Sequence, residues 1–382
     1  MKILHVIPHY FPSINFGGTP VSCHYLSYNL ALLGNEVDVL TTDVFSADNR
    51  YYKKVEKKGN YNIFRFKNIS NSLAYKNRFV TPIPNSYFIF KKLSNYDIVQ
   101  LHEYRNLLNV MMCLAKPFIR AKFILYPLGT YPIFNTQNKF KKAFDFLFAK
   151  IINNSIDKYV VVSEMEKRSL ISSGVPAHKI KKIYYGVDVI ERRFNKQKPF
   201  NWKFQYILYI GRIDKRKGVH HLIKAYAKSA ISKKNIHLVI AGNGNDYLKL
   251  CKKIVNNLKI NKYVHFLKPV GGRKKSTLYH HANLVVYITD KEAYGLVPME
   301  GAICGTASLY SKTAGVAEIL RKYKIGEGVN YKDNKTLAKK IKKLGPQKNK
   351  VTTEKINQLL IEYSWFSVAK KFERLYGYVK KN

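Results

Sequence analysis

Acidic side chains are scarce in this chain of 382 residues. Aspartate and glutamate number 24 against 67 lysines and arginines, which gives a formal net charge of +43 at neutral pH. Three explanations fit such a surplus: a nucleic-acid-binding face, attraction to an anionic membrane or to phosphate-bearing substrates, and a lysine-rich composition without functional meaning. The last explanation accounts for the many lysines but not for the shortage of acids.

Cysteine pairs, long apolar runs and a dinucleotide fingerprint are also missing. The four cysteines lie far apart without a Cys-x-x-Cys pair, which excludes a zinc motif or a disulfide framework and favours a reducing cytoplasm. No stretch reaches the about 18–20 apolar residues that span a bilayer, and residues 1–8 lack the apolar core of a signal peptide. Without Gly-x-Gly-x-x-Gly, a nicotinamide cofactor has no support.

Short apolar runs alternate with helical patterns along most of the chain. Strand patterns occupy residues 2–7, 36–40, 62–66, 97–101, 122–126, 158–162 and 182–184, then 205–210, 237–241, 264–267, 284–288 and 307–310. Helical patterns occupy residues 21–33, 137–152 and 164–172, then 219–230, 246–258, 274–281, 299–304 and 317–320. Because such alternation produces parallel sheets covered on both faces, the predicted fold class is α/β.

The polar stretch 187–203 separates the two series and is predicted to be a linker. We therefore expect two doubly wound, Rossmann-like domains facing a cleft, at residues 1–190 and 191–360. The tail is helical from 351 onward, and its last part, 361–382, is expected to pack back on the first domain. In such sheets ligands bind beyond the carboxyl ends of the strands, so the residues after each strand are the ones to inspect.

Two glycines, Gly17 and Gly18, stand between the first strand and the first helix. Glycines before a helix N-terminus let backbone N–H groups approach an anion closely. A plain turn is the alternative interpretation of this pair.

Arg212 and Lys217 follow the first strand of the second series. A guanidinium clamps a phosphate through two hydrogen bonds, and an ammonium supplies a compact positive charge. The alternative is a solvated run of charges, which composition alone favours.

Glu292 and Glu300 stand eight positions apart after the strand at 284–288. Between them lies a loop with Gly295, and a helix begins near Pro298. Because acids are scarce, two glutamates at the carboxyl end of one strand are informative. For Glu300 the alternative is a first-turn residue that merely favours the helix dipole.

This spacing resembles the E-x7-E loop of retaining GT-B glycosyltransferases, in particular the family-four group. Further segments resemble the same family in the same order, at residues 7–40, 97–105, 161–188, 209–226, 239–250, 264–270 and 301–320. The resemblance covers nearly the whole chain and implies the GT-B architecture. The chain departs from the family pattern at Gln100, Leu128, Thr289, Tyr294 and Ala317.

The resemblance implies a role for each candidate residue. Arg212 and Lys217 would bind the donor diphosphate in place of a metal ion, Glu300 the ribose, and Glu292 hydroxyls of the donor sugar. His102 would lie near the reacting centre, with a structural histidine as the alternative. Backbone amides would contact the sugar and the phosphates at Tyr294, Gly295, Leu296 and Val297 and, from the first domain, at Gly17 and Gly18.

The implied reaction is a retaining transfer of a hexose from a nucleoside diphosphate sugar to a glycan or a lipid-linked glycan. No cofactor, metal or nucleic acid is expected. The helix at 139–152 mixes phenylalanine and lysine, and it either contacts an anionic membrane from the cytoplasmic side or is an ordinary core helix. The alternatives in function are a sugar-nucleotide hydrolase or epimerase of the same fold and a basic nucleic-acid-binding protein.

Overall fold

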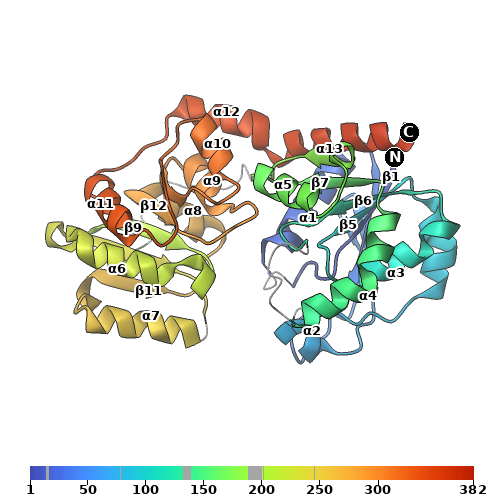
Figure 1. Ribbon diagram of the computed structural model, residues 1–382, viewed down its shortest axis with the longest axis horizontal. Helices are drawn as coiled ribbons and strands as arrows, with labels where there is room; N and C mark the ends of the chain where they lie inside the picture. The colour runs from blue at the N-terminus through green and yellow to red at the C-terminus, as the bar shows by residue number, and fades with distance from the viewer. Residues whose placement is uncertain (14–16, 78, 132–138, 188–199, 201, 245) are drawn as a thin grey trace. The chain divides into compact units, whose positions relative to one another are not determined.

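The computed structural model describes residues 1–13, 17–77, 79–131, 139–187, 200, 202–244 and 246–382 (Figure 1). The chain forms two compact units, and each is described by itself. The N-terminal unit comprises Met1–Gly186 and Trp365–Asn382, and the C-terminal unit comprises Val187–Ser364.

The N-terminal unit is built on an eight-stranded sheet in the order β3-β4-β2-β1-β5-β6-β7-β8. Its strands are β1 Lys2–Val6, β2 Glu36–Thr42, β3 Val55–Lys58, β4 Tyr61–Phe66, β5 Ile98–His102, β6 Lys122–Tyr126, β7 Lys158–Val161 and β8 Ile180–Lys182. All neighbours pair in parallel except β3, which lies antiparallel to β4 at the edge. β1 and β5 are buried almost throughout, and this burial explains their near-continuous apolar sequences.

Helices cover both faces of this sheet (Figure 1). They are α1 Gly18–Leu32, α2 Asn71–Asn77, α3 Leu107–Ala115, α4 Lys139–Ser155, α5 Glu164–Ser172 and α13 Trp365–Lys381, with shorter helical turns at Phe88–Lys92, Leu93–Asn95, Lys116–Phe118 and Ala177–Lys179. The C-terminal helix α13 packs beside α1, where the rings of Tyr25 and Trp365 stack with centroids 5.9 Å apart. Helices α1 and α13 thus bury one face of the central strands.

The C-terminal unit has a six-stranded parallel sheet in the order β11-β10-β9-β12-β13-β14. Its strands are β9 Gln205–Ile210, β10 Ile236–Ala241, β11 Val264–Leu267, β12 Leu284–Tyr287, β13 Ser308–Ser311 and β14 Glu327–Val329. Its helices are α6 Val219–Ser229, α7 Asp246–Asn257, α8 Gly272–His281, α9 Val297–Ile303, α10 Ala317–Lys322, α11 Asn334–Leu344 and α12 Thr353–Tyr363, with 3-10 turns η7 Lys215–Lys217, η8 Ile231–Lys234 and η9 Asn261–Tyr263.

The predicted α/β class is confirmed, and some predicted details are wrong. The strand expected at 182–184 lies at Ile180–Lys182, and the single tail helix is two helices that meet at Ser364. Ser364 is extended, with φ −59° and ψ 150°, and the units divide after it rather than after residue 360. The expected boundary at 190/191, most of the linker and the first two residues of the expected helix 137–152 lie outside the described residues.

Among the described residues, no helix combines the length and the apolar character needed to cross a membrane.

Candidate functional site

The loop after β9 carries Arg212 and Lys217. Asp214 begins the turn η7, and its Oδ1 atom accepts a hydrogen bond from the backbone N–H of Lys217 at 3.1 Å. The Arg212 side chain is 59% exposed, and among the described residues its one ion pair is with Asp214, at 3.4 Å. The loop therefore presents one exposed guanidinium and one lysine that a local cap holds in position.

Lys217 and Glu292 form an ion pair, with Nζ 2.7 Å from Oε2. Their side chains are 14% and 29% exposed, so water only partly screens the pair. Lys217 Nζ also donates to the Tyr287 hydroxyl at 3.2 Å, and Thr289 Oγ1 donates to Glu292 at 3.4 Å. The structure thus brings together two predicted site residues that are 75 positions apart in the sequence.

The loop from Glu292 to Leu296 is fixed by the segment that follows β13. The carbonyl of Glu292 accepts from the N–H of Gly315, and the carbonyl of Tyr294 accepts from Val316, both at 3.0 Å. Gly295 has φ +96°, and a Cβ atom there would lie 2.7 Å from the Tyr287 ring. Glycine is therefore required both by the backbone conformation and by the close approach of that ring.

Glu300 lies in α9, and two side chains of α8 hold its carboxylate. Lys275 Nζ donates to Oε1 at 2.5 Å, and the Tyr279 hydroxyl donates to Oε2 at 2.7 Å. These two residues are four positions apart and so lie on one face of their helix. The sequence analysis did not identify Lys275 or Tyr279. Their spacing of four residues, on a predicted helix directly before the strand at 284–288, was a usable signal.

Burial and nearby negative charges keep the hydroxyl of Tyr287 neutral. Tyr287 is buried, and burial, together with the negative charges of Glu292 and Glu300, raises its pKa well above the ordinary value. Its hydroxyl therefore stays protonated at neutral pH and accepts the hydrogen bond from Lys217. The two glutamates belong to separate clusters, one with Lys217 and one with Lys275.

In the N-terminal unit, Gly17 and Gly18 lie at the start of α1. Gly17 is the N-cap with φ +112°, and among the described residues outside its chain neighbours no atom lies within 4 Å of the position a Cβ would take. Backbone conformation rather than space therefore selects glycine there. Residues 14–16 lie outside the described part of the chain, and a role for these amides at the donor stays a prediction.

His102 is the last residue of β5 and is fully buried. Its Nε2 atom lies 2.9 Å from His5 Nδ1, 3.3 Å from Gln100 Nε2 and 3.6 Å from Cys23 Sγ. Burial lowers the pKa of His102 well below its ordinary value and that of His5 to about 3. This is the placement of a structural histidine, and a catalytic role for His102 stays a prediction.

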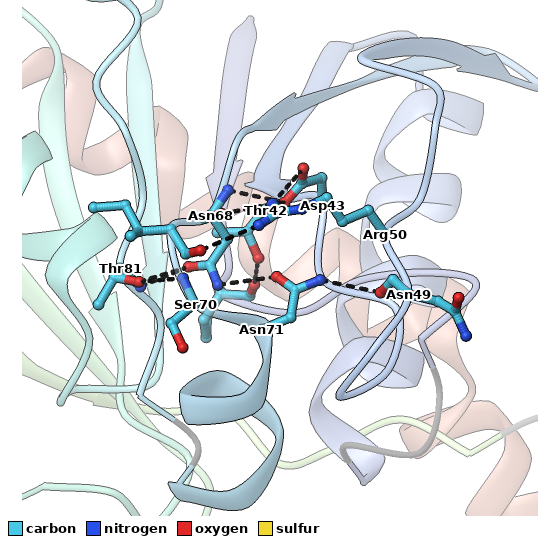
Figure 2. Close-up of polar contacts among 10 residues, drawn as sticks. Thr42, Asp43, Asn49, Arg50, Asn68, Ser70, Asn71 and Thr81 are labelled. Carbon is cyan, nitrogen blue, oxygen red and sulfur yellow. Dashed lines mark hydrogen bonds and ion pairs between the residues drawn. The ribbon is translucent and has the colours of Figure 1, made fainter.

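A polar network that the sequence did not reveal lies beyond the carboxyl ends of β2 and β4. Figure 2 shows Asp43, which follows β2, accepting from the Arg50 guanidinium through both carboxylate oxygens, at 3.1 and 3.0 Å. Asp43 Oδ1 also accepts from the N–H of Asn68 at 2.8 Å, and the Asn68 side chain bonds Thr81 and Asn71. The network ties three loops together at this edge of the sheet.

Two family models match the chain consecutively. Glycosyltransferase Family 4 matches residues 16–191, and Glycosyl transferases group 1 matches residues 191–357. An uncharacterized glycosyltransferase of Methanocaldococcus jannaschii is 26% identical over 98% of each chain.

Solved structures share the fold. Anabaena HepE in complex with UDP and glucose has a TM-score of 0.75 at 15% identity, covering 99% of this chain and 100% of its own. WaaG, a glycosyltransferase involved in lipopolysaccharide biosynthesis, has a TM-score of 0.66 at 16% identity. The match covers 99% of this chain and 98% of WaaG. The two sheets with their intervening helices are those of a GT-B enzyme. The chain belongs to the group 1 glycosyltransferases.

Proposed function

We propose that this enzyme is a metal-independent, retaining hexosyltransferase whose donor is a nucleoside diphosphate sugar. The observation that carries the proposal is the Lys217–Glu292 pair at 2.7 Å, beside the exposed Arg212, at the carboxyl edge of the second sheet. The similar fold of HepE, which was solved with UDP and glucose and with UDP-glucose, supports the donor class.

The proposed chemistry uses charge rather than a protein nucleophile. The leaving diphosphate gains negative charge as the glycosidic bond breaks, and Arg212 and Lys217 stabilise that charge where a metal ion would otherwise be needed. Glu292 binds hydroxyls of the sugar and Glu300 binds the ribose. Attack from the face of the leaving group retains the anomeric configuration, and the leaving phosphate takes the acceptor's proton.

Thermal unfolding with a panel of nucleoside diphosphate sugars tests the donor site. At least one of them is expected to raise the unfolding temperature of the wild-type enzyme. Arg212→Ala should lose this shift, whereas Lys249→Ala, which removes a cation 83% exposed in α7, should keep it. No stabilisation by any donor, or an undiminished shift in Arg212→Ala, would count against the proposal.

Product analysis separates transfer from the other reactions. Transfer with retention gives the donor's anomeric configuration in a new glycoside by NMR, and activity should persist in EDTA. Release of free sugar alone would indicate a hydrolase, and a changed sugar nucleotide would indicate an epimerase.

We propose further that the acceptor is lipid-linked and that α4 contacts an anionic membrane at its cytoplasmic face. Phe144 and Ile152 of α4 are buried, whereas Phe146 is 88% and Leu147 60% exposed. The Nε and Nη2 atoms of Arg105 donate to both carboxylate oxygens of Asp145, at 2.8 and 2.7 Å, and this pair anchors the helix. Exposed lysines accompany the exposed apolar side chains: Lys139, Lys142 and Lys150.

Vesicle flotation tests this contact. The wild-type enzyme should float with anionic vesicles and not with neutral ones. Phe146→Ser with Leu147→Ser should reduce flotation, whereas Ile361→Ser, at a position 76% exposed in α12, should not. Equal behaviour with both vesicle types would reject the membrane contact.

A further inference from the structure

Three metal-ligating side chains meet in the interior of the N-terminal unit. His5 lies in β1 and His102 in β5, and these adjacent parallel strands pair with His5 opposite Gln100. His102 is two residues beyond Gln100 and therefore lies on the same face of the sheet as His5. Helix α1 covers this face and contributes Cys23. The fold thus brings His102 together with His5, 97 residues before it in the sequence, and with Cys23, 79 residues before it.

The spacing of the three ligand atoms suits a small metal ion. His5 Nδ1 and His102 Nε2 are 2.9 Å apart, and Cys23 Sγ is 3.6 Å from His102 Nε2. All three ligand atoms lie within 4.8 Å of one another, and all three side chains are fully buried. Ligand atoms around a tetrahedral zinc ion are separated by about 3.3–3.6 Å, so modest side-chain shifts would complete the geometry.

Hydrogen bonding leaves this cluster incompletely satisfied. His5 Nε2 and His102 Nδ1 are buried without a hydrogen-bond partner among the described residues. Besides His102, Cys23 Sγ has one hydrogen-bond partner among those residues, Ser27 Oγ at 4.0 Å. The nearby Gln100 amide is bonded to the Tyr376 hydroxyl. His5 Nε2 and His102 Nδ1 are on the opposite side of each ring from the ligand atoms His5 Nδ1 and His102 Nε2, so a metal ion would leave them unpartnered. What favours a metal ion is the spacing of the three ligand atoms, all within 4.8 Å of one another.

We propose that His5, Cys23 and His102 bind one zinc ion. Two imidazoles and a thiolate are ligands that zinc prefers, and three protein ligands leave one coordination position open. On binding, the zinc ion takes the place of the Cys23 thiol proton, which passes to the buffer. Cys23 has no second ligand nearby in the sequence, so motif spacing could not reveal the site.

The site belongs to the N-terminal unit, whereas the proposed diphosphate ligands Arg212 and Lys217 belong to the other unit. None of the three proposed zinc ligands is a proposed diphosphate ligand, so the zinc ion is not assigned the charge-neutralising role proposed for Arg212 and Lys217. Its presence does not depend on the proposed function, because metal content is measured without donor or acceptor.

Metal content and cobalt spectroscopy test the site. The enzyme is produced in zinc-supplemented medium, freed of loose metal by gel filtration, and analysed by mass spectrometry for zinc per chain. A parallel cobalt-grown sample should show a thiolate-to-cobalt charge-transfer band. We expect one ion per chain in the wild-type protein, and loss of both the zinc and the band in Cys23→Ser.

Cys113→Ser is the matched control, because Cys113 is also buried in the N-terminal unit, where its side chain interacts with Ser155 rather than with a histidine. It should keep both the zinc and the cobalt band. Wild-type protein without zinc, zinc without a cobalt–thiolate band, or an unchanged band in Cys23→Ser would overturn the proposal. If Cys23→Ser does not fold, the site is assigned by elimination. The wild-type protein should show the cobalt–thiolate band, and the variants of the other three cysteines should all retain it: Cys113→Ser, Cys251→Ser and Cys304→Ser.

Discussion

The ammonium group of Lys217 lies 2.7 Å from the carboxylate of Glu292. The residue proposed to bind the donor's phosphate and the residue proposed to bind its sugar therefore neutralise each other before any donor is present. If the proposed roles hold, a bound donor shares or replaces this ion pair, with phosphate oxygens next to Nζ and a sugar hydroxyl donating to Oε2. Donor affinity is then predicted to depend on the strength of this internal contact.

Replacing Lys217 by methionine should separate catalysis from stability. Transfer is expected to fall by about 10²–10³, the usual loss when one donor to a developing negative charge is removed. The free energy of unfolding should fall by about 1–2 kcal/mol, because Glu292 is left partly buried without its cation. Steady-state kinetics and urea unfolding measure the two effects.

The double variant Lys217→Met with Glu292→Gln is the control for that interpretation. It removes the uncompensated carboxylate, so stability should return toward that of the wild-type enzyme while transfer stays low. Lys249→Met, at an exposed lysine, should change neither quantity. Normal transfer by Lys217→Met would contradict the proposed role.

The contacts around Glu300 predict an effect on donor affinity. Lys275→Met and Tyr279→Phe each remove one donor to its carboxylate and free it to rotate. KM for the donor should rise about five- to tenfold, equivalent to about 1 kcal/mol. The penalty should shrink for a donor analogue without ribose hydroxyls, since the carboxylate then has nothing to bind.

Lys274→Met provides the comparison, because Lys274 is on the same helix but its ammonium lies over the Phe200 ring, 4.6 Å from the centroid. Its KM should stay near that of the wild-type enzyme. An equal rise in KM for donors with and without ribose hydroxyls would show that Lys275 and Tyr279 do not act through Glu300.

Gly295 and Gly305 form a matched pair of glycines in the C-terminal unit. Both have positive φ, +96° and +88°, so alanine is strained at either position. At Gly295 the new Cβ would also meet the Tyr287 ring, at 2.7 Å, whereas at Gly305 no described residue outside its chain neighbours lies within 4 Å. Gly295→Ala should therefore lose transfer as well as stability, and Gly305→Ala should lose stability alone. Equal kcat in the two variants would rule out a role for the 292–296 loop in transfer.

The placement of Glu292 and Glu300 in separate clusters was predictable from the sequence, but the partners of the two carboxylates were not. A spacing of eight residues across a loop and a helix already indicated that the two carboxylates do not act as one pair. Their lysines come from η7 and α8, which are 75 and 25 residues away from the glutamates they contact. Only the folded chain shows which of the 67 basic residues reach them.

Elements without a periodic pattern were missed for physical reasons. Nearly every residue of α3 is apolar, so no polar face marks a helical period there. Strand β14 has three residues, Glu327–Val329, and contains a glycine. The burial of His102 depends on helices α1 and α13, which cover the end of β5. Cys23 of α1 contacts His102 from 79 residues away in the chain, and Tyr376 of α13 contacts Gln100 of the same strand from 276 residues away. Strand-end position alone could not predict that burial.

Glu166 predicts a pH dependence of stability in the N-terminal unit. Its carboxylate is fully buried and accepts from the N–H of Gly129 at 2.6 Å and of Val162 at 2.9 Å. Burial, which these two N–H groups partly oppose, raises its pKa from 4.5 to about 7. The folded state therefore binds the proton more tightly than the unfolded state, and stability should fall as pH rises from 4.5 to 7.

Glu166→Gln removes this titration. The neutral amide costs a constant amount, because its single carbonyl oxygen can accept only one of the two hydrogen bonds, but it should abolish the slope. The stability difference between wild type and variant should change by up to about 3 kcal/mol across the window. Urea unfolding from pH 5 to pH 8 measures it, with Trp202→Phe as background so that Trp365 alone reports on the N-terminal unit.

Glu164→Gln on the same helix is the control for this pH profile. Its hydrogen bond and ion pair with Lys182 lower the pKa of Glu164, so its contribution to stability is lost only as pH falls below the ordinary value of 4.5. Between pH 5 and pH 8 its profile should run parallel to that of the wild-type enzyme. Parallel profiles for Glu166→Gln as well would mean that the buried carboxyl does not titrate in this range. A wild-type profile that falls relative to Glu166→Gln as pH rises, while it stays parallel to Glu164→Gln, would identify this carboxyl as the source of the pH dependence.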